Sequence, residues 1–350
     1  MFGAAAASGG VNPNKDVQVT PALPDGVTSV AFSPRANILV ATCWDNSAYC
    51  WEVSPTGQAT AKASTSHAQP VLCSAWNADG TGVFTGSCDK TVKLWNLATN
   101  QSQQVAAHDG PVRHCAFIPE TNLLVTGSWD KTLKYWDCRT PSAVFSYTLP
   151  ERCYALDVRH PLLVVGTADR HLLVFNLQQP QTPYKTLQSP LKWQTRCVAC
   201  FPDKAGYLIG SIEGRVAVQH VEESVGATKN FTFKCHREGA DIYPVNAIAF
   251  HPVHGTFVTA GSDGTYNFWD KDSKQRLKAM AKASYGADPA PITAGAFNAD
   301  GSIYAYGVSY DWGRGFAGYN PGAMPSYVHL HGTQETEVKA RQKPPATGRK

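Results

Sequence analysis

The sequence lacks any run of about 18 consecutive apolar residues, the length that a membrane-spanning helix needs. Its opening segment, MFGAAAASGG, has no basic residue and no long apolar stretch, so it does not resemble a secretory signal peptide. We therefore expect neither membrane insertion nor secretion. Residues 1–14 are predicted to form a disordered lead, and residues 332–350, rich in Lys, Arg, Pro and Gly, a disordered basic tail.

The chain also lacks a strong charge and the usual catalytic motifs. Its net charge of +4 neither requires nor excludes a nucleic acid or an acidic partner. There is no glycine-rich phosphate-binding loop, no Gly-x-Ser-x-Gly elbow and no regularly spaced pair of carboxylates. We therefore predict that the protein is not an enzyme and uses no cofactor.

Ten cysteines are present, but the paired motifs of metal sites are not. Cys197 and Cys200 form a single Cys-x-x-Cys, whereas zinc needs four converging ligands, usually from two such pairs. This pair falls in a strand-like segment, where positions three apart point to opposite faces. We predict that these cysteines pack in a core as reduced thiols of an intracellular protein, and that there is no metal site.

One short string recurs about every 40–50 residues, which is the mark of a repeat architecture. It is GSCDKTVKLW at residues 86–95 and GSWDKTLKYWD at residues 127–137. Looser copies cover residues 44–51, 166–175, 210–219 and 261–269. The pattern matches WD-repeat propellers, in which each blade is a four-stranded sheet.

Seven strand-like segments open the repeats, and most of them end in turn residues such as Pro or Asp-Gly. They are residues 27–32, 71–76, 112–117, 153–158, 197–201, 245–250 and 292–297. We predict an all-β fold, a seven-bladed WD-repeat β-propeller over residues 15–331. Residues 16–19 are expected to complete the last blade, because the ring must close with its own ends.

His108, Ser128 and Asp130 fall in one repeat and carry the residue types of a catalytic triad. The alternative is structural. In WD repeats, a His before the first strand, a hydroxyl of the second strand, the turn Asp and the third-strand Trp form a buried hydrogen-bond network. We assign His108, Ser128, Asp130 and Trp136 to such a structural tetrad.

The fifth copy departs from the template. Glu213 takes the Asp position, Arg215 the Thr position and Gln219 the Trp position. Arg is rarely buried without a partner, and its planar fork suits a carboxylate or a phosphate. Arg215 is therefore a candidate contact for a binding partner, and the alternative is an ion pair with Glu213 inside the blade.

Aromatic and basic residues alternate after this copy, in NFTFKCHR at residues 230–237. Residues 271–282 add five basic residues against one acid. Aromatic side chains interleaved with cations suit an acidic peptide or single-stranded nucleic acid, and the alternative is a solvated outer strand. The candidate groove residues are Phe233, Lys234, Arg237, Trp269, Lys271, Lys274 and Arg276.

Three segments resemble a WD-repeat family whose members bind GLEBS, a short acidic hairpin in their partners. The segments are SIEGRVAV at 211–218, TFKCHR at 232–237 and YPVNAI at 243–248. The family has two sisters, the messenger-RNA export factor of the nuclear pore and the spindle-checkpoint adaptor. Segments similar to the export factor are residues 14–16, 127–134, 149–154, 189–192, 250–256 and 309–312.

The resemblance covers about residues 12–335, although residues 313–325 are Gly-rich where the family is more charged. It implies a nuclear adaptor at the nuclear pore, shuttling to the cytoplasm, that holds the GLEBS segment of an FG nucleoporin. Arg215, beside Glu213, would clamp an acidic residue of the hairpin. The candidate groove would hold single-stranded RNA or messenger ribonucleoprotein.

Two other functions stay open. A spindle-checkpoint adaptor would bind GLEBS segments of kinetochore kinases, and the Tyr-Asp-Trp at residues 310–312 argues against it. A substrate receptor of a ubiquitin ligase would use the Trp-Asp-x-Arg pattern at residues 136–139. The alternative reading of that pattern is a blade end followed by a solvated Arg139.

Overall fold

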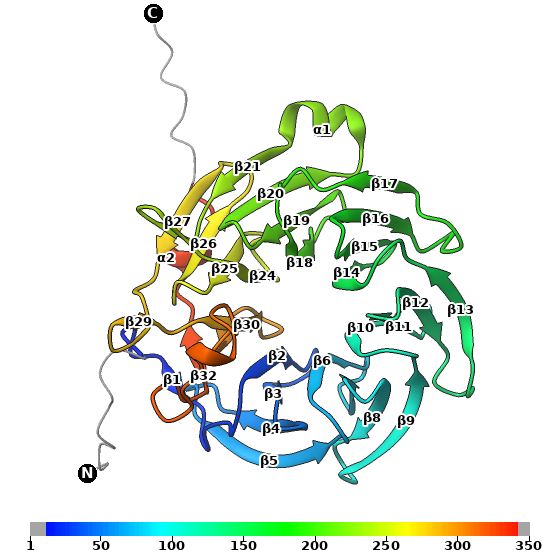
Figure 1. Ribbon diagram of the computed structural model, residues 1–350, viewed down its shortest axis with the longest axis horizontal. Helices are drawn as coiled ribbons and strands as arrows, with labels where there is room; N and C mark the ends of the chain where they lie inside the picture. Colours follow the sequence, from blue (N-terminus) through cyan, green and yellow to red (C-terminus); the bar gives the residue numbers. More distant parts are fainter. Residues whose placement is uncertain (1–11, 342–350) are drawn as a thin grey trace, which may run out of the picture.

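The computed structural model describes residues 12–341. Seven four-stranded antiparallel sheets are arranged around a central axis, each with its first strand innermost (Figure 1). The predicted seven-bladed β-propeller is confirmed. Blade 1 consists of β2 (Val27–Phe32), β3 (Ile38–Cys43), β4 (Ser47–Val53) and β5 (Ala59–Ser66). Blade 2 consists of β6 (Val71–Trp76), β7 (Gly82–Ser87), β8 (Thr91–Asn96) and β9 (Gln101–Ala107).

The next three blades follow in chain order. Blade 3 consists of β10 (Val112–Ile118), β11 (Leu123–Ser128), β12 (Thr132–Trp136) and β13 (Ala143–Thr148). Blade 4 consists of β14 (Cys153–Arg159), β15 (Leu162–Thr167), β16 (His171–Asn176) and β17 (Lys185–Gln188). Blade 5 consists of β18 (Thr195–Cys200), β19 (Gly206–Ser211), β20 (Arg215–His220) and β21 (Phe231–Lys234).

The last two blades bring the ends of the chain together. Blade 6 consists of β24 (Val245–Phe250), β25 (Phe257–Gly261), β26 (Tyr266–Asp270) and β27 (Gln275–Ala279). Blade 7 consists of β30 (Ile292–Phe297), β31 (Ile303–Val308), β32 (Tyr327–Gly332) and β1 (Val17–Gln18). Its outer strand therefore comes from the start of the chain.

Two short hairpins and three short helices lie in the loops of the described residues. Two hairpins pair β22 (Arg237–Glu238) with β23 (Asp241–Ile242), and β28 (Ser284–Tyr285) with β29 (Asp288–Pro289). The helices are α1 (Glu223–Lys229), η1 (Phe316–Gly318) and α2 (Glu335–Val338). Within residues 12–341, no helix has the length and apolar character needed to cross a membrane.

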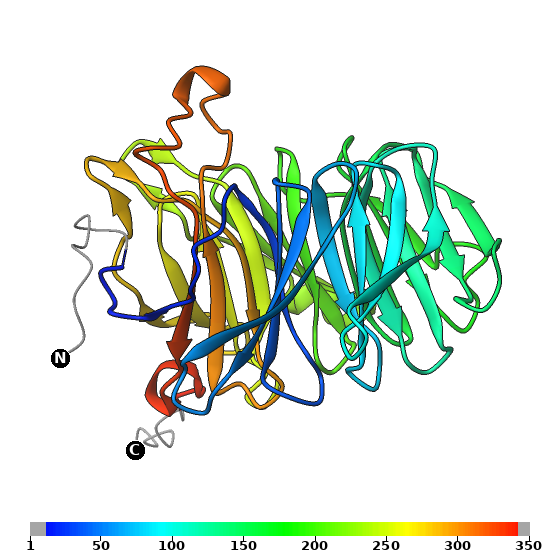
Figure 2. The same ribbon diagram turned by 90° about the horizontal axis from the view of Figure 1, so that it is seen from below.

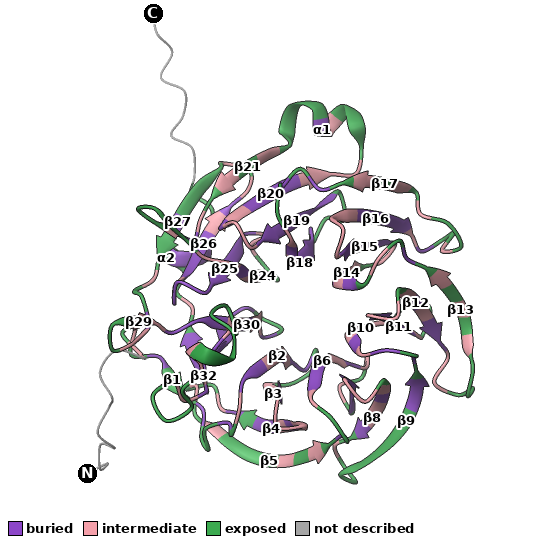
Figure 3. Ribbon diagram, in the orientation of Figure 1, coloured by how far each residue is buried: buried purple, intermediate pink, exposed green. Residues whose placement is uncertain are grey.

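The burial of each strand follows its distance from the solvent. The second strands of blades 2, 4, 5, 6 and 7 are buried along their whole length, because neighbouring blades cover both faces. The outermost strands β5, β9 and β13 expose many residues, shown in green in Figure 3. This explains why the inner strands are apolar runs and the outer strands are polar.

The two faces of the ring carry different loops. The turns between second and third strands, and the loops between consecutive blades, lie on one face, which we call the turn face. The long loop between β31 and β32 belongs to this face by the same topology, and it projects from the disc as the orange segment in Figure 2. Helix α2 lies on the opposite face, in red. The turn face is therefore the face from which this long loop projects.

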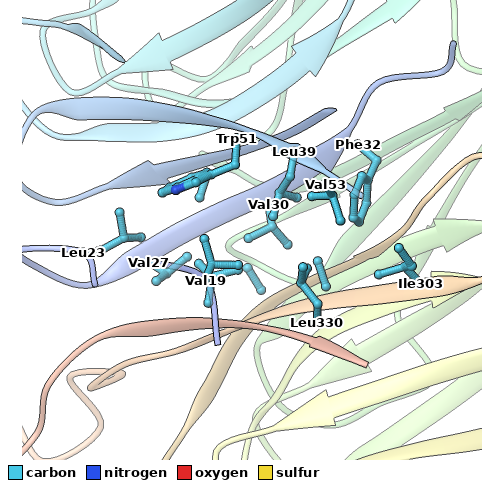
Figure 4. Packing of buried hydrophobic residues seen from close by; sticks show 14 of the residues in the cluster. Val19, Leu23, Val27, Val30, Phe32, Leu39, Trp51, Val53, Ile303 and Leu330 are labelled. Atoms are coloured by element: carbon cyan, nitrogen blue, oxygen red, sulfur yellow. The ribbon is translucent and has the colours of Figure 1, made fainter. Parts of the chain in front are cut away.

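Strand β1 closes the ring. Val17 pairs with Leu330 and Gln18 with His329, so the expected closure by the start of the chain is confirmed. Figure 4 shows apolar residues from blades 1 and 7 packed together at this junction. Val19 and Leu330 are among them, and both are buried. The closure thus combines strand pairing with a continuous core.

A charged network joins the two ends at the same place. Asp16 accepts hydrogen bonds from the hydroxyls of Tyr266 (2.8 Å) and Tyr306 (2.7 Å) and lies 2.8 Å from His331 Nδ1. His331 Nε2 lies 2.9 Å from Glu337. Burial alone would raise the pKa of Asp16, but these hydrogen bonds outweigh it and lower that pKa. Burial likewise opposes protonation of His331, and its two carboxylate partners outweigh burial and raise its pKa.

The described chain extends past both predicted boundaries of the propeller. Asn14, which belongs to the predicted lead, exchanges two hydrogen bonds with the backbone of Ala281. Helix α2 lies inside the predicted tail, where Glu337 joins the closing network and Val338 is buried. The remainder of the two predicted segments, residues 1–11 and 342–350, lies outside the described residues.

Candidate functional site

Blade 3 contains the hydrogen-bond network that the repeat predicts, with one correction. His108 Nδ1 lies 2.9 Å from Asp130, and His108 Nε2 lies 2.7 Å from the hydroxyl of Thr126. The indole N–H of Trp136 donates to the same Thr126 hydroxyl at 2.8 Å. The hydroxyl of the tetrad is therefore Thr126 and not Ser128. Both residues lie on the same face of β11, but Thr126 is closer to the third-strand Trp.

Ser128 has a separate role that excludes the triad reading. Its hydroxyl donates to the carbonyls of Gly110 and Pro111 and accepts the backbone N–H of Asp130. His108 is hydrogen-bonded to Thr126 instead, so no base faces the Ser128 hydroxyl. These bonds fix the turn; they do not activate a nucleophile.

The carboxylate of Asp130 holds this turn together. Burial would raise its pKa, but hydrogen bonds from His108 and Thr132 outweigh burial and lower it. The same carboxylate accepts the N–H of Asp109, in the loop that enters the blade. Blades 2 and 6 repeat the arrangement with His67, Thr85 and Asp89, and with His236, Thr259, Asp263 and Trp269.

Blade 5 replaces the core of this network with apolar residues. The strand registers place Ile209 at the position of Thr126 and Gln219 at the position of Trp136. Leu191 occupies the His position, and it belongs with Ile209 to one buried apolar cluster. Because all three hydrogen-bonding groups have changed together, none is left buried without a partner.

Glu213 keeps the one part of the network that ties the loop to the turn. Its carboxylate accepts the N–H of Lys192 at 3.1 Å, as Asp130 accepts that of Asp109. Arg237 donates two hydrogen bonds to the backbone carbonyl of Glu213. The turn of blade 5 is thus tied to its surroundings without a histidine.

Arg215 lies beside this turn and is only loosely held. Its Nε lies 3.6 Å from the Glu213 carboxylate, which is an ion pair but too long for a hydrogen bond. The Arg215 side chain is 31% exposed, whereas that of Glu213 is 11% exposed. The ion pair inside the blade is therefore present, yet most of the guanidinium N–H donors remain available to another carboxylate.

A hollow on the turn face lies next to this turn. It has a volume of about 670 Å³ and is lined by Ile212, Ile242, Trp312 and Met324, among others. Ile242 pairs with Arg237, which donates to the Glu213 carbonyl, and this links the hollow to the turn of blade 5. The turn of blade 5, the β22–β23 hairpin and the loop after β31 enclose it.

Large apolar side chains gather on the same face. Trp193 is 59% exposed and Phe316 83% exposed, and Ile242 and Trp312 are also exposed. All four belong to loops of the turn face of blades 4 to 7. Exposed apolar residues rimmed by polar ones are typical of surfaces that bind another protein. The charges of Lys192, Lys234 and Arg237 border this region.

A second surface lies between blades 5 and 6, at the outer edge. The rings of Phe233 and Trp269 have centroids 4.8 Å apart, and Phe231 lies 6.0 Å from Phe233. The Arg276 guanidinium lies 5.8 Å from the Trp269 centroid, and Lys274 Nζ 4.7 Å from that of Phe231. We call this set the aromatic–basic groove. Sequence reasoning missed Phe231, although its spacing of two from Phe233 indicates the same strand face.

Three predicted groove residues lie elsewhere. Lys234 follows Phe233 directly in β21, so its side chain points to the other face of the strand. Arg237 contacts the Glu213 turn instead. The Lys271 side chain is only 10% exposed, because its ammonium lies 5.0 Å from the Phe201 ring and pairs with Asp272.

The remaining sequence motifs have local partners. Cys197 and Cys200 donate to different carbonyls, those of Val245 and Asp157, and burial raises the pKa of Cys197 to about 12. Over residues 12–341 no three His, Cys, Asp or Glu side chains are grouped as metal ligands would be. Arg139, 80% exposed, pairs with Asp137 at 2.6 Å.

Comparison with known proteins places this geometry in context. The family model "WD domain, G-beta repeat" matches residues 17–52, 60–96, 100–137 and 227–270. The chain is 59% identical to "Protein RAE1" of Arabidopsis thaliana over 353 residues, covering 100% of this chain and 99% of the relative. It is 47% identical to the "mRNA export factor" of Danio rerio, covering 95% and 93%. It is also 47% identical to the "Poly(A)+ RNA export protein" of Schizosaccharomyces pombe, covering 94% of each chain.

Proposed function

The chain belongs to the family of WD-repeat messenger-RNA export factors, and we propose that it is a non-enzymatic adaptor in messenger-RNA export. On this proposal the protein works in the nucleus and at the nuclear pore and shuttles to the cytoplasm. The printed names of the relatives support export, and the propeller supplies binding faces. The identity of the partner is argued from the loosely held Arg215 and from a hollow of mixed polar and apolar lining on the turn face.

The partner that fits this face is the acidic GLEBS hairpin of an FG nucleoporin. Arg215 would receive an acidic residue of the hairpin in a bidentate, charge-assisted contact, while Glu213 keeps the guanidinium oriented. Apolar residues of the hairpin would cover Ile242 and Trp312 in the hollow. Such a site combines an apolar anchor with a charged clamp, which is the usual anatomy of a strong interface.

The test is a binding measurement with a synthetic GLEBS peptide. Arg215→Glu places a second acid beside Glu213 and is expected to reduce affinity at least about a hundredfold, because both the attraction is lost and a repulsion is added. Arg139→Glu is the matched control, an exposed Arg with its own acidic neighbour outside the hollow. It is expected to bind like wild type. Wild-type affinity in Arg215→Glu, with an unchanged circular dichroism spectrum, would overturn the hairpin assignment.

The aromatic–basic groove is proposed to hold single-stranded RNA. Phe231, Phe233 and Trp269 offer faces on which bases stack, and Lys274 and Arg276 offer charges for phosphates. Because phosphate contacts release counterions, affinity is expected to fall steeply as salt increases. Each lost cation is expected to lower the slope of log affinity against log salt by about 0.7.

The groove is tested by titrating a fluorescent oligoadenylate at several salt concentrations. Lys274→Glu combined with Arg276→Glu is expected to abolish the salt-dependent binding. Lys62→Glu is the control, since Lys62 is an exposed, ion-paired lysine on the outer strand of blade 1. RNA affinity that does not change with salt, or that Lys62→Glu weakens equally, contradicts an RNA groove at this place.

The two alternatives separate in an affinity purification from cells. A spindle-checkpoint adaptor would recover mitotic kinases with GLEBS segments in place of nuclear-pore proteins. A ubiquitin-ligase receptor would recover ligase components in a manner that Arg139→Glu abolishes. Arg139 is bonded to Asp137 by two charged contacts, which leaves it less available to a partner than Arg215 is.

A further inference from the structure

Every innermost strand of the propeller has the same irregularity. The register between the first and second strands shifts after the first residue, so the second residue of each innermost strand is an unpaired β-bulge. A bulge re-aims its side chain out of the regular alternation. The seven bulge residues are Thr28, Leu72, Arg113, Tyr154, Arg196, Asn246 and Thr293.

These residues form a ring around the central channel. A cavity of about 550 Å³ occupies the channel mouth on the turn face, and five of the seven bulge residues line it, including Arg113 and Arg196. The same two arginines also line a smaller cavity deeper in the channel, between the innermost strands. Both guanidinium groups therefore face a space that six blades enclose.

The ring carries two positive charges and no acid. Within residues 12–341, neither Arg113 nor Arg196 has a carboxylate within 4.0 Å, although sixteen ion pairs occur elsewhere in that range. Arg113 donates one hydrogen bond, to the carbonyl of Leu72 at 3.4 Å. Arg196 donates two, both to the amide oxygen of Asn246. Most of the ten N–H donors of the pair thus have no protein acceptor.

The two arginines also disfavour one another. Burial, and then the positive charge of Arg196, lower the pKa of Arg113. Asp311 is the acid at the channel mouth, but its carboxylate is held by the Ser262 hydroxyl and the N–H of Gly313. Unpaired buried charges are costly unless a partner compensates them. A ligand of opposite charge is the compensation that this ring lacks.

We propose that the channel mouth is an oxyanion site in which Arg113 and Arg196 together bind one phosphate group. Two cations match a phosphate dianion better than a singly charged carboxylate, and each planar guanidinium offers paired donors to its oxygens. Trp44, Trp129 and Trp312 line the same cavity, and the buried indole N–H of Trp129 has no acceptor in the described chain. These rings leave room beside the phosphate for the carbon part of a phosphate ester.

The site adjoins the hollow proposed for the hairpin, because Arg196, Asp311 and Trp312 line both cavities. Arg113 and Trp129 line the channel cavity and not the hollow, and neither Arg215 nor the aromatic–basic groove lines either one. Loss of hairpin binding in Arg215→Glu, or of RNA binding in the groove variants, therefore leaves this proposal standing. The phosphate has two possible sources, a free phosphate compound or a phosphorylated side chain of a partner. The chemistry of recognition is the same, and the two sources are separated in the experiment.

Thermal unfolding of the full chain with inorganic phosphate provides the first test. At a concentration about tenfold above the dissociation constant, the midpoint is expected to rise by about 2 °C, and above that concentration to rise further with the logarithm of the phosphate concentration. Sodium chloride at equal ionic strength is expected to give a smaller rise that does not follow this dependence. A wild-type midpoint that responds equally to both salts would overturn the proposal.

Variants separate an anion site from a structural role of the arginines. Arg113→Met and Arg196→Met are each expected to abolish the phosphate-dependent rise, while Arg113→Met leaves the phosphate-free midpoint unchanged or higher, because it removes one of two like charges. Arg139→Met, at an exposed ion-paired site, is expected to respond like wild type. If the arginine variants lower the midpoint equally with and without phosphate, the arginines are structural and the proposal fails.

Calorimetric titration then identifies the source of the phosphate. O-phosphoserine that binds more tightly than inorganic phosphate, and loses this binding in Arg196→Met, supports a phosphorylated partner. Inorganic phosphate that binds equally or more tightly supports a free phosphate compound. Absence of heat with both probes, in the wild-type protein, refutes the site.

Discussion

Blades 3 and 5 are built on one template and solve the same structural problem with opposite chemistry. Blade 3 buries a polar network in which His108, Thr126 and Trp136 satisfy one another. Blade 5 fills the equivalent space with Leu191 and Ile209. In both blades an acid still clamps the entering loop to the turn, Asp130 in one and Glu213 in the other.

This difference shows that a blade can form without the polar network. A fully satisfied polar network and a well-packed apolar cluster are both stable, whereas a mixture would leave donors unpaired. Once the histidine is gone, the residue two positions after the acid has only the acid itself as a partner inside the blade. Arg215 occupies that position, and its long ion pair with Glu213 leaves most of its N–H donors for a binding partner.

The largest effect on stability is expected when the shared hydrogen-bond partner is removed from the network of blade 3. Thr126→Val keeps the volume but leaves His108 Nε2 and the indole N–H of Trp136 without a partner. We expect the free energy of unfolding to fall by about 2–4 kcal/mol. Ile209→Val, at the equivalent position of blade 5, is expected to cost only about 1 kcal/mol, for one lost methylene.

Urea denaturation of the two variants measures this difference. Ser128→Ala provides a control within blade 3, because Ser128 bonds to the turn and not to the tetrad. Its expected cost is smaller than that of Thr126→Val. Equal losses from all three substitutions would show that packing, and not hydrogen bonding, holds blade 3 together.

Blade 6 has the polar network of blade 3 and also contributes to the aromatic–basic groove beside blade 5. Substitutions of its Trp269 can therefore separate a structural role from a binding role. Trp269 donates to Thr259 as Trp136 does to Thr126, but it also packs against the Phe233 ring in the aromatic–basic groove. Trp269→Phe is expected to lower both stability, by about 1 kcal/mol, and RNA affinity, by several-fold. Trp136→Phe is expected to lower stability alone, which oligoadenylate titration of both variants would reveal.

The closing blade extends the comparison to a network that carries charge. The lowered pKa of Asp16 means that its contribution is present above its ordinary value of 3.8 and is lost as the pH falls. The raised pKa of His331 means that its contribution is complete below 6.5 and is lost as the pH rises through the folded value. The closure is therefore expected to be strongest between about pH 4 and 6.5.

The measurement is the difference in unfolding free energy between wild type and His331→Gln as a function of pH. This difference is expected to shrink from pH 6 to pH 9, where wild-type His331 loses its proton. A His108→Gln profile serves as the comparison within blade 3. A difference for His331→Gln that grows with pH would contradict a protonated His331 in the folded state.

The sequence predicted the ring well because its signals are local and repeated. The apolar first strands, the turn residues and the recurring Asp allowed the seven blades and their closure to be placed. The choice between Thr126 and Ser128 was wrong because both are hydroxyl residues on one face of one strand. Only the distance to the indole of Trp136, across two strands, separates them.

Residues of the candidate surfaces were harder to place, for a related reason. Strand parity already separates Lys234 from Phe233, but the burial of Lys271 depends on Phe201 from the neighbouring blade. The pair Arg113 and Arg196 gave no signal in the sequence pattern, because each is a single basic residue at the start of an apolar strand. Their significance comes from the seven bulges that direct them into one channel.

The smallest effect on stability is expected when Arg215 of blade 5 is changed to the residue that the repeat has at this position. Arg215→Thr gives blade 5 the residue that blade 3 has at Thr132, yet no histidine is present to receive its hydroxyl. The unfolding free energy is therefore expected to change by less than about 0.5 kcal/mol, while affinity for the GLEBS peptide falls at least about tenfold. Thr132→Ala, which removes bonds to Asp130 and His108, is the stability comparison and is expected to cost about 1–2 kcal/mol. If Arg215→Thr destabilises the propeller as much as Thr132→Ala does, then Arg215 supports its blade through Glu213, and the freedom that we attribute to this position does not exist.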